Sequence, residues 1–221
     1  MIPPKYNHLK KNYFSILFFL FLSITCLAQK EASHWYFGSK AGLDFSSGAP
    51  IADTNGELIT TEGCATISDV SGNLLFYTDG RIVWNKNHVP MANGTGLKGN
   101  ASSSQSAVVI RKPSSSTKYI IFTVSIATSN DGLKYSEVDM NLNSGLGDVT
   151  SIKNVNITSS TCEKITVMEH QNEKDFWMIT QLHGSSNDKF QTYLFTKDGI
   201  SNAPIICNLG PKITLSLNTL G

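Results

Sequence analysis

The chain has 221 residues, only 16% of them charged, and its formal net charge at pH 7 is +1. An average soluble protein has about 25% charged residues. The near-zero net charge disfavours binding to nucleic acid or to an acidic membrane surface through a global electrostatic field, and the length allows one or two domains.

The N-terminal residues have the organisation of a secretory signal peptide. Lysines between positions 5 and 11 form a positive n-region, and Tyr13–Leu22 is almost wholly apolar. Cys26-Leu27-Ala28 supplies small residues at the −3 and −1 positions of a cleavage site. The apolar segment is short for a membrane anchor, which needs about 20 residues, and the context of a lipoprotein signal at Cys26 is poor. We expect residues 1–28 to be removed, leaving a mature chain from Gln29 with no membrane span.

Helical periodicity is nearly absent after residue 30, and strand-like runs follow one another along the chain. In Ile67–Trp84, short apolar runs are separated by Ser-Gly and Asp-Gly dipeptides. Glycine adopts a positive φ at no steric cost and Asp tolerates it, so these dipeptides favour tight antiparallel turns. In chain order, the expected strands are Trp35–Phe37, Ala65–Ser68, Leu74–Thr78, Ile82–Asn85, Ala107–Arg111, Tyr119–Val124, Lys134–Val138, Ile165–His170, Phe176–Gln181, Gln191–Thr196 and one beginning at Pro204–Cys207.

A coarser repeat runs through these strands. Leu75–Thr78, Ile120–Thr123 and Phe176–Thr180 are apolar runs that end in threonines 45 and 57 residues apart, and Tyr193–Thr196 resembles them. Such spacing matches one four-stranded blade of a β-propeller. We expect an all-β fold of repeated four-stranded antiparallel blades over residues 29–221. About four blades would make an incomplete propeller with exposed β edges and an exposed apolar blade face.

Four segments resemble a known family. They are HWYFGSKAGLDFSSGAP (34–50), the stretch 60–110 that begins TTEGCATISDVSGNLLFYTDG, GLKYSEVDMNLNSGLGDVT (132–150) and EKITVMEH (163–170). Together they are similar to the N-terminal β-propeller module of large Bacteroidota cell-surface proteins, which are labelled gliding-motility-associated and typically end in a type IX secretion sorting domain.

The resemblance implies a truncated module and an exported, non-enzymatic function at the outer cell surface. Such a module would bind a protein or polysaccharide in adhesion. Two alternatives remain open. The first is a secreted polysaccharide-acting enzyme, a glycoside hydrolase or lyase, on a propeller scaffold. The second is a periplasmic partner or assembly factor.

No motif predicts a catalytic or cofactor site. Gly94–Gly99 spells G-x-G-x-x-G, but no helical pattern follows it, so a Gly-rich surface loop is favoured over a dinucleotide site. Glycoside hydrolysis needs two carboxylates that face one sugar, and no spacing forces such a pair among the acidic residues. These residues are Asp44, Glu57, Glu62, Asp79, Glu137, Asp139, Glu163, Glu169 and Asp175.

Metal ligation and nucleophilic catalysis have no sequence support either. The histidines after the signal, His34, His88, His170 and His183, show no metal-ligand spacing, and no G-x-S-x-G motif occurs. We expect no cofactor and no metal site, although scattered loop carbonyls leave calcium open.

Two turns resemble the Asp-box of sialidase-type propellers, with glycine displaced by one position. They lie at Ser68–Gly72 and Ser129–Tyr135, and we expect each Asp to accept hydrogen bonds from backbone N–H groups in a structural turn. Trp35, Trp84 and Trp177 could form a sugar-stacking platform, but burial between blades is favoured because each lies in a strand-like run.

Three cysteines, Cys64, Cys162 and Cys207, remain after signal cleavage. Export would permit one disulfide. Semi-buried free thiols are the favoured interpretation, and whether Cys162 pairs with Cys207 stays open.

Overall fold

The computed structural model describes residues 30–127, 129–159, 161–183 and 188–210, and the expected signal peptide at 1–28 lies outside these ranges. The described residues form seventeen β-strands and one 3-10 turn, η1 (Asn143–Gly145), with no α-helix among them. The expected all-β fold is confirmed. No helix in the described ranges is long and apolar enough to cross a membrane.

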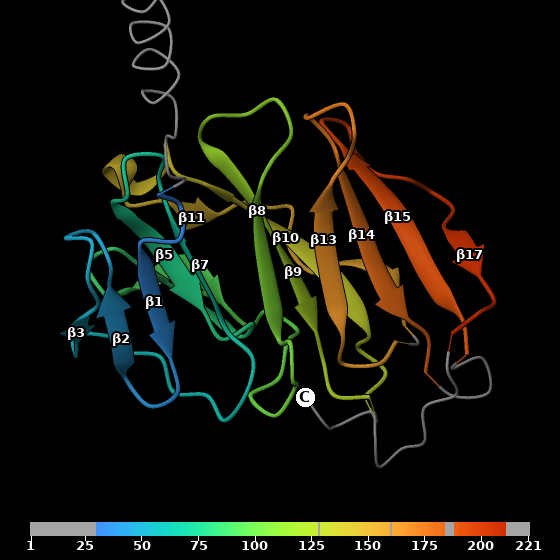
Figure 1. Ribbon diagram of the computed structural model, residues 1–221, viewed down its shortest axis with the longest axis horizontal. Helices are drawn as coiled ribbons and strands as arrows, with labels where there is room; N and C mark the ends of the chain where they lie inside the picture. The colour runs from blue at the N-terminus through green and yellow to red at the C-terminus, as the bar shows by residue number, and fades with distance from the viewer. Residues whose placement is uncertain (1–29, 128, 160, 184–187, 211–221) are drawn as a thin grey trace, which may run out of the picture.

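The strands form four antiparallel sheets that follow one another in chain order (Figure 1). Sheet 1 contains β1 (His34–Phe37), β2 (Ala41–Asp44) and β3 (Ile51–Asp53). Sheet 2 contains β4 (Ala65–Ser68), β5 (Leu74–Thr78), β6 (Ile82–Asn85) and β7 (Pro90–Thr95). Sheet 3 contains β8 (Ala107–Arg111), β9 (Lys118–Val124), β10 (Leu133–Asp139), β11 (Asp148–Val149) and β12 (Val155–Thr158). Sheet 4 contains β13 (Ile165–Glu169), β14 (Phe176–Gln181), β15 (Phe190–Thr196), β16 (Gly199–Ile200) and β17 (Ile205–Cys207).

Sheets 2 to 4 share a four-position plan. Sheet 2 has the order β4-β5-β6-β7. In sheets 3 and 4, two short strands share the fourth position: β11 and β12 both pair with β10, and β16 and β17 both pair with β15. Sheet 1 has three strands among the described residues.

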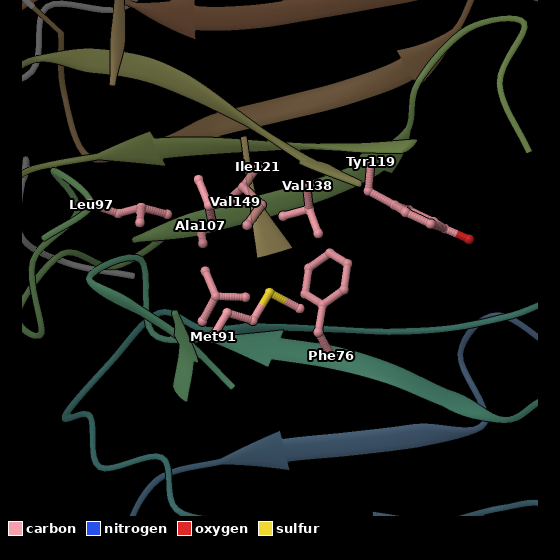
Figure 2. Close-up of a cluster of buried hydrophobic side chains, with 9 residues drawn as sticks. Phe76, Met91, Leu97, Ala107, Tyr119, Ile121, Val138 and Val149 are labelled. Atoms are coloured by element: carbon pink, nitrogen blue, oxygen red, sulfur yellow. The ribbon is translucent and has the colours of Figure 1, made fainter. Parts of the chain in front are cut away.

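The sheets stack face to face, and the first strand of each contacts the first strand of the next: β1 contacts β4, β4 contacts β8, and β8 contacts β13. Three hydrophobic clusters fill the interfaces. Between sheets 1 and 2 lie Tyr36, Leu58, Tyr77 and Trp84. Between sheets 2 and 3 lie Phe76, Val83, Met91, Leu97, Ala107, Tyr119, Ile121, Val138 and Val149 (Figure 2). Between sheets 3 and 4 lie Ile110, Ile120, Phe122, Val124, Leu133, Ile165, Met178, Tyr193 and Phe195.

The two middle sheets are therefore covered on both faces. In β9, Ile121 points toward sheet 2 while Phe122 points toward sheet 4. In β5, Phe76 points toward sheet 3 while Tyr77 points toward sheet 1. Successive side chains of a strand point to opposite faces, so burial of both faces explains why these strands are continuous apolar runs.

The repeat motif is confirmed in part. Its first three copies lie in β5, β9 and β14, the second strand of three successive sheets. The fourth copy, Tyr193–Thr196, lies in β15, which is a third strand, so it is not an equivalent repeat. Pro90–Thr95 was not among the expected strands, but it forms β7, which pairs with β6.

Candidate functional site

A polar hollow lies between two hairpin turns of neighbouring sheets. The β8–β9 turn and the β13–β14 turn lie side by side at the upper edge of Figure 1. They enclose about 440 Å³, within the usual range for ligand sites. We call this hollow the hairpin cleft. Its lining is Arg111, Lys112, Pro113, Ser114, Ser115, Ser116, Glu169, Glu173, Lys174 and Phe176.

Local hydrogen bonds hold the β8–β9 turn. The backbone N–H of Lys112 donates to the carbonyl of Lys118 over 2.9 Å and closes the hairpin. The hydroxyl of Ser115 accepts from the N–H groups of Thr117, at 3.3 Å, and Lys118, at 3.0 Å. Pro113 restricts the backbone further by fixing φ. This wall of the cleft is therefore constrained before any ligand arrives.

The β13–β14 turn is held in a similar way. Its closing bond runs from the N–H of His170 to the carbonyl of Asp175 over 2.8 Å. The side-chain oxygen of Asn172 accepts from the N–H groups of Lys174 and Asp175, while its amide donates to the Asp175 carboxylate. Because both turns are braced by their own side chains, the cleft is preformed.

A buried ionic cluster anchors the sheet 3 side of the cleft. Glu137 of β10 is 2% exposed; its Oε2 lies 2.6 Å from Nζ of Lys112, and its Oε1 lies 2.8 Å from Nζ of Lys118. Burial raises the pKa of Glu137, but the hydrogen bonds and charges of both lysines outweigh burial and lower it below its ordinary value. Glu137 therefore stays ionised and holds Lys112 in the cleft wall.

The remaining charges of the cleft are free to contact a ligand. Arg111, Glu169, Glu173 and Lys174 form no ion pair with any other residue that the structure describes. Two are cations and two are anions, so this set is neutral overall. Together with the serine hydroxyls and the Phe176 ring, they provide donors, acceptors and one aromatic face.

The nine acidic residues identified from the sequence do not form a free carboxylate pair. Glu137 and Asp139 both form ion pairs with Lys118, at 2.8 Å and 3.7 Å. Glu163 is fully buried and accepts hydrogen bonds from the backbone of Ser104 and of Ala127. Others are bound to neighbours: Asp44 to Ser46, Glu57 to Lys40, Glu62 to Ser102, Asp79 to Arg81 and Asp175 to Asn172. Glu169 alone among the nine lines the hairpin cleft.

Three of the histidines lie in different local environments. His34 contacts Ser68 and Asp44, His88 contacts the Tyr77 hydroxyl, and His170 packs against Trp177 at a ring distance of 5.2 Å. In the part of the chain that the structure describes, no group of three or more His, Cys, Asp or Glu side chains could hold a metal ion.

The tryptophans do not form a common platform, since they lie on sheets 1, 2 and 4. Trp84 is buried in the interface between sheets 1 and 2, as expected. Trp35 is 50% exposed, so the expected burial is wrong for this residue. With Phe37, Cys64 and the β4 residues Ala65 and Thr66, it lines an apolar groove of about 520 Å³.

The two Asp-box-like turns differ. Oδ1 of Asp69 accepts from the N–H groups of Ser71, at 2.8 Å, and Asn73, at 2.9 Å, which confirms a structural turn. In the second turn, the Asp131 carboxylate meets only the Ser129 hydroxyl, at 3.5 Å, among the described residues. That carboxylate does not brace the backbone in the expected way.

The glycine-rich motif is not the expected surface loop throughout. Gly94 is buried within β7. Farther along the chain, the fully buried hydroxyl of Ser106 donates to the carbonyl of Asp79 over 2.6 Å. No helix follows the motif before β8, so the requirement for a dinucleotide phosphate site is not met.

All three cysteines are free thiols, as favoured from the sequence. Cys162 is buried and Cys64 is half-buried, but Cys207 is exposed rather than semi-buried.

No known protein family, curated protein or solved structure matches the chain.

The hairpin cleft could not be located from the amino-acid sequence. A usable signal was the Pro-Ser-Ser-Ser turn at 113–116 between two strands dense in Val and Ile. The facing turn at 170–175 had no signal that linked it to the first.

Proposed function

We propose that the protein is an exported, non-enzymatic binding module of the outer cell surface. It presents the hairpin cleft to a protein or polysaccharide in adhesion. The observation that carries the proposal is the cleft itself, in which two braced turns hold unpaired charges of both signs around a preformed hollow. Export and surface location rest on the expected signal peptide at 1–28 and on the resemblance to Bacteroidota surface modules.

The scaffold is proposed to be an incomplete β-propeller with the four sheets as successive blades. Two observations support this arrangement. The first strands of successive sheets contact one another, as strands around a central axis do. Sheets 2 to 4 also share a plan of four positions. In such a scaffold, turns between strands of adjacent blades form the ligand surface.

The ion pairs of Glu137 and Asp139 with lysines make these two carboxylates poor candidates for a general acid. A general acid needs a pKa raised toward the working pH, whereas lysine hydrogen bonds lower the pKa of Glu137. Asp139 is also bridged by Lys118. A neutral set of charged and hydroxyl groups suits a polyhydroxylated chain or a peptide with charges of both signs.

A binding assay with two cleft variants tests this function. The purified protein is screened against arrays of glycans and of cell-surface proteins, and Arg111→Ala and Glu169→Ala are compared with Lys40→Ala. Lys40 forms an exposed ion pair with Glu57 on sheet 1, away from the cleft. We expect each cleft variant to weaken binding at least about tenfold, the effect of losing one charged hydrogen bond, while Lys40→Ala binds normally.

Two results would contradict the proposal. Equal binding by all three variants would remove the cleft as the ligand site. Release of reducing ends or unsaturated products from a glycan, abolished by one carboxylate substitution, would identify an enzyme. Protease treatment of intact cells tests location: a surface protein is degraded, whereas a periplasmic assembly factor is protected.

A further inference from the structure

Among the residues that the structure describes, both ends of the sheet stack carry exposed apolar side chains on their outer faces. On sheet 1, Tyr36 points into the stack, so its neighbours Trp35 and Phe37 point outward. Leu43 lies opposite Trp35 in the register, and the Trp35 and Phe45 rings are 5.0 Å apart. We call this surface the leading face.

The outer surface of sheet 4 is apolar in the same way. Ile165 and Val167 of β13 pack into the stack, which turns Met168 outward. The register places Met168 beside Trp177, and Trp177 beside Leu194. A second row contains Ile179, Thr192 and Ile205. We call this surface the trailing face; Met168 is 54% exposed and Ile205 is 62% exposed.

These faces continue a pattern that the molecule already uses three times. At each internal interface, the face of one sheet that points toward the C-terminal end of the stack packs on the opposite face of the next sheet. The contacts are made by aliphatic and aromatic side chains. The free leading face and the free trailing face are the two halves of one further interface of this kind. A contiguous exposed apolar surface of a soluble protein commonly marks a protein interaction site.

We propose that a second copy of this chain covers both faces, trailing face on leading face, and closes a ring of two copies. Contacts between unlike surfaces form rings when the rotation closes and filaments when it does not. Two copies bring eight sheets, which is within the four to eight blades typical of closed propellers. The ring rests on the propeller-type arrangement proposed above and is independent of the ligand.

Sedimentation velocity of the purified protein tests the ring. Wild type is expected at twice the monomer mass, with no larger species as concentration rises. Trp35→Lys and Met168→Glu each alter one face, so each is expected to raise the dissociation constant of the dimer at least tenfold. Val70→Lys, at an exposed position in the β4–β5 turn of sheet 2, is the matched control and is expected to remain dimeric.

A mixture of the two variants gives the decisive result. One copy of each retains a complete wild-type interface between the intact trailing face and the intact leading face. Mixing Trp35→Lys with Met168→Glu should therefore restore dimer that neither variant forms alone. Circular dichroism shows whether each variant is folded.

The other outcomes overturn the ring. If the wild-type protein stays monomeric, a second copy does not cover the two faces. If it forms an open series of larger species, the contact builds a filament instead of a closed ring. Dimer loss in only one of the two variants, or no recovery on mixing, indicates a contact between like faces. Cleft binding by the monomeric variants is measured in parallel, so failure of the ring leaves the proposed function separately testable.

Discussion

Lys118 donates from Nζ to Oε1 of Glu137 over 2.8 Å, and Glu137 is almost completely buried. Replacing Glu137 with Gln removes the charge that compensates Lys112 and Lys118. We expect the free energy of unfolding to fall by about 2 kcal/mol, as for a lost hydrogen bond to a charged group. Glu57→Gln is the matched control because its pair with Lys40 is exposed on both sides, and it should cost less than about 0.5 kcal/mol. Urea denaturation measures both, and equal losses would contradict the role of burial.

The same carboxylate predicts a pH dependence with a definite sign. The folded-state pKa of Glu137 is lowered, so the folded state releases its proton more readily than the unfolded chain. Its stabilising contribution is present above the unfolded pKa of about 4.3 and is lost as pH falls through the folded value. The stability difference between wild type and Glu137→Gln should therefore shrink from about pH 5 downward. Urea midpoints at a series of pH values test this, and a constant difference would argue against it.

Gly80 should tolerate alanine much less well than Gly199. Both residues have positive φ, 83° and 112°. A Cβ at Gly80 would lie 2.2 Å from the Ser106 hydroxyl, whereas a Cβ at Gly199 would meet no atom within 4 Å. Gly199→Ala should cost about 1–2 kcal/mol of backbone strain, and Gly80→Ala should cost more than about 3 kcal/mol because overpacking adds to that strain. Thermal unfolding of both variants tests the prediction, which fails if the two shifts are alike.

Tyr77 is central to the interface between sheets 1 and 2. Its ring stacks on Tyr36 at 4.4 Å and on Trp84 at 5.5 Å, and its hydroxyl accepts from the N–H of Glu57 at 3.0 Å. Tyr77→Ala should destabilise the protein by about 3–5 kcal/mol through the cavity that it leaves. Tyr77→Phe keeps the stack and should cost only about 1 kcal/mol. Urea denaturation gives both values, and near-UV circular dichroism should report loss of the stack in Tyr77→Ala only.

The three thiols should react at different rates with a disulfide reagent. Cys207 is exposed, whereas Cys162 is buried and burial raises the pKa of its thiol. Burial also raises the pKa of the half-buried Cys64. Because the thiolate is the reacting species, Cys207 should be modified first and Cys162 only on unfolding. Mass spectrometry of timed samples identifies each site, and early labelling of Cys162 would contradict the buried position.

Strands with a dense apolar sequence could be located from the sequence almost to the residue. Leu74–Thr78, Ala107–Arg111 and Phe176–Gln181 coincide with β5, β8 and β14. Those strands are buried by a neighbouring sheet, so their composition carries the signal. By contrast, β2 and β7 contain glycine or proline and owe their strand conformation to pairing with β1 and β6. Tertiary contacts override weak local preference in both.

The candidate site could not be found in this way. Arg111 and Glu169 lie 58 residues apart, and only the stacking of sheets 3 and 4 brings them to one cleft. The prediction that Trp35 is buried was wrong for a related reason. A strand-like run indicates that one face is covered, but it does not indicate which sheet is the last in a stack.

Each sheet consists of consecutive strands, and the contacts between sheets link neighbours in chain order. A chain that emerges from the translocation channel with its N-terminus first can therefore complete one sheet, then dock the next on a template already in place. Each new sheet then needs to find only the sheet that formed immediately before it, as in solenoid repeats with nearest-neighbour coupling. The geometry thus allows vectorial folding, in which the order of synthesis and the order of assembly coincide.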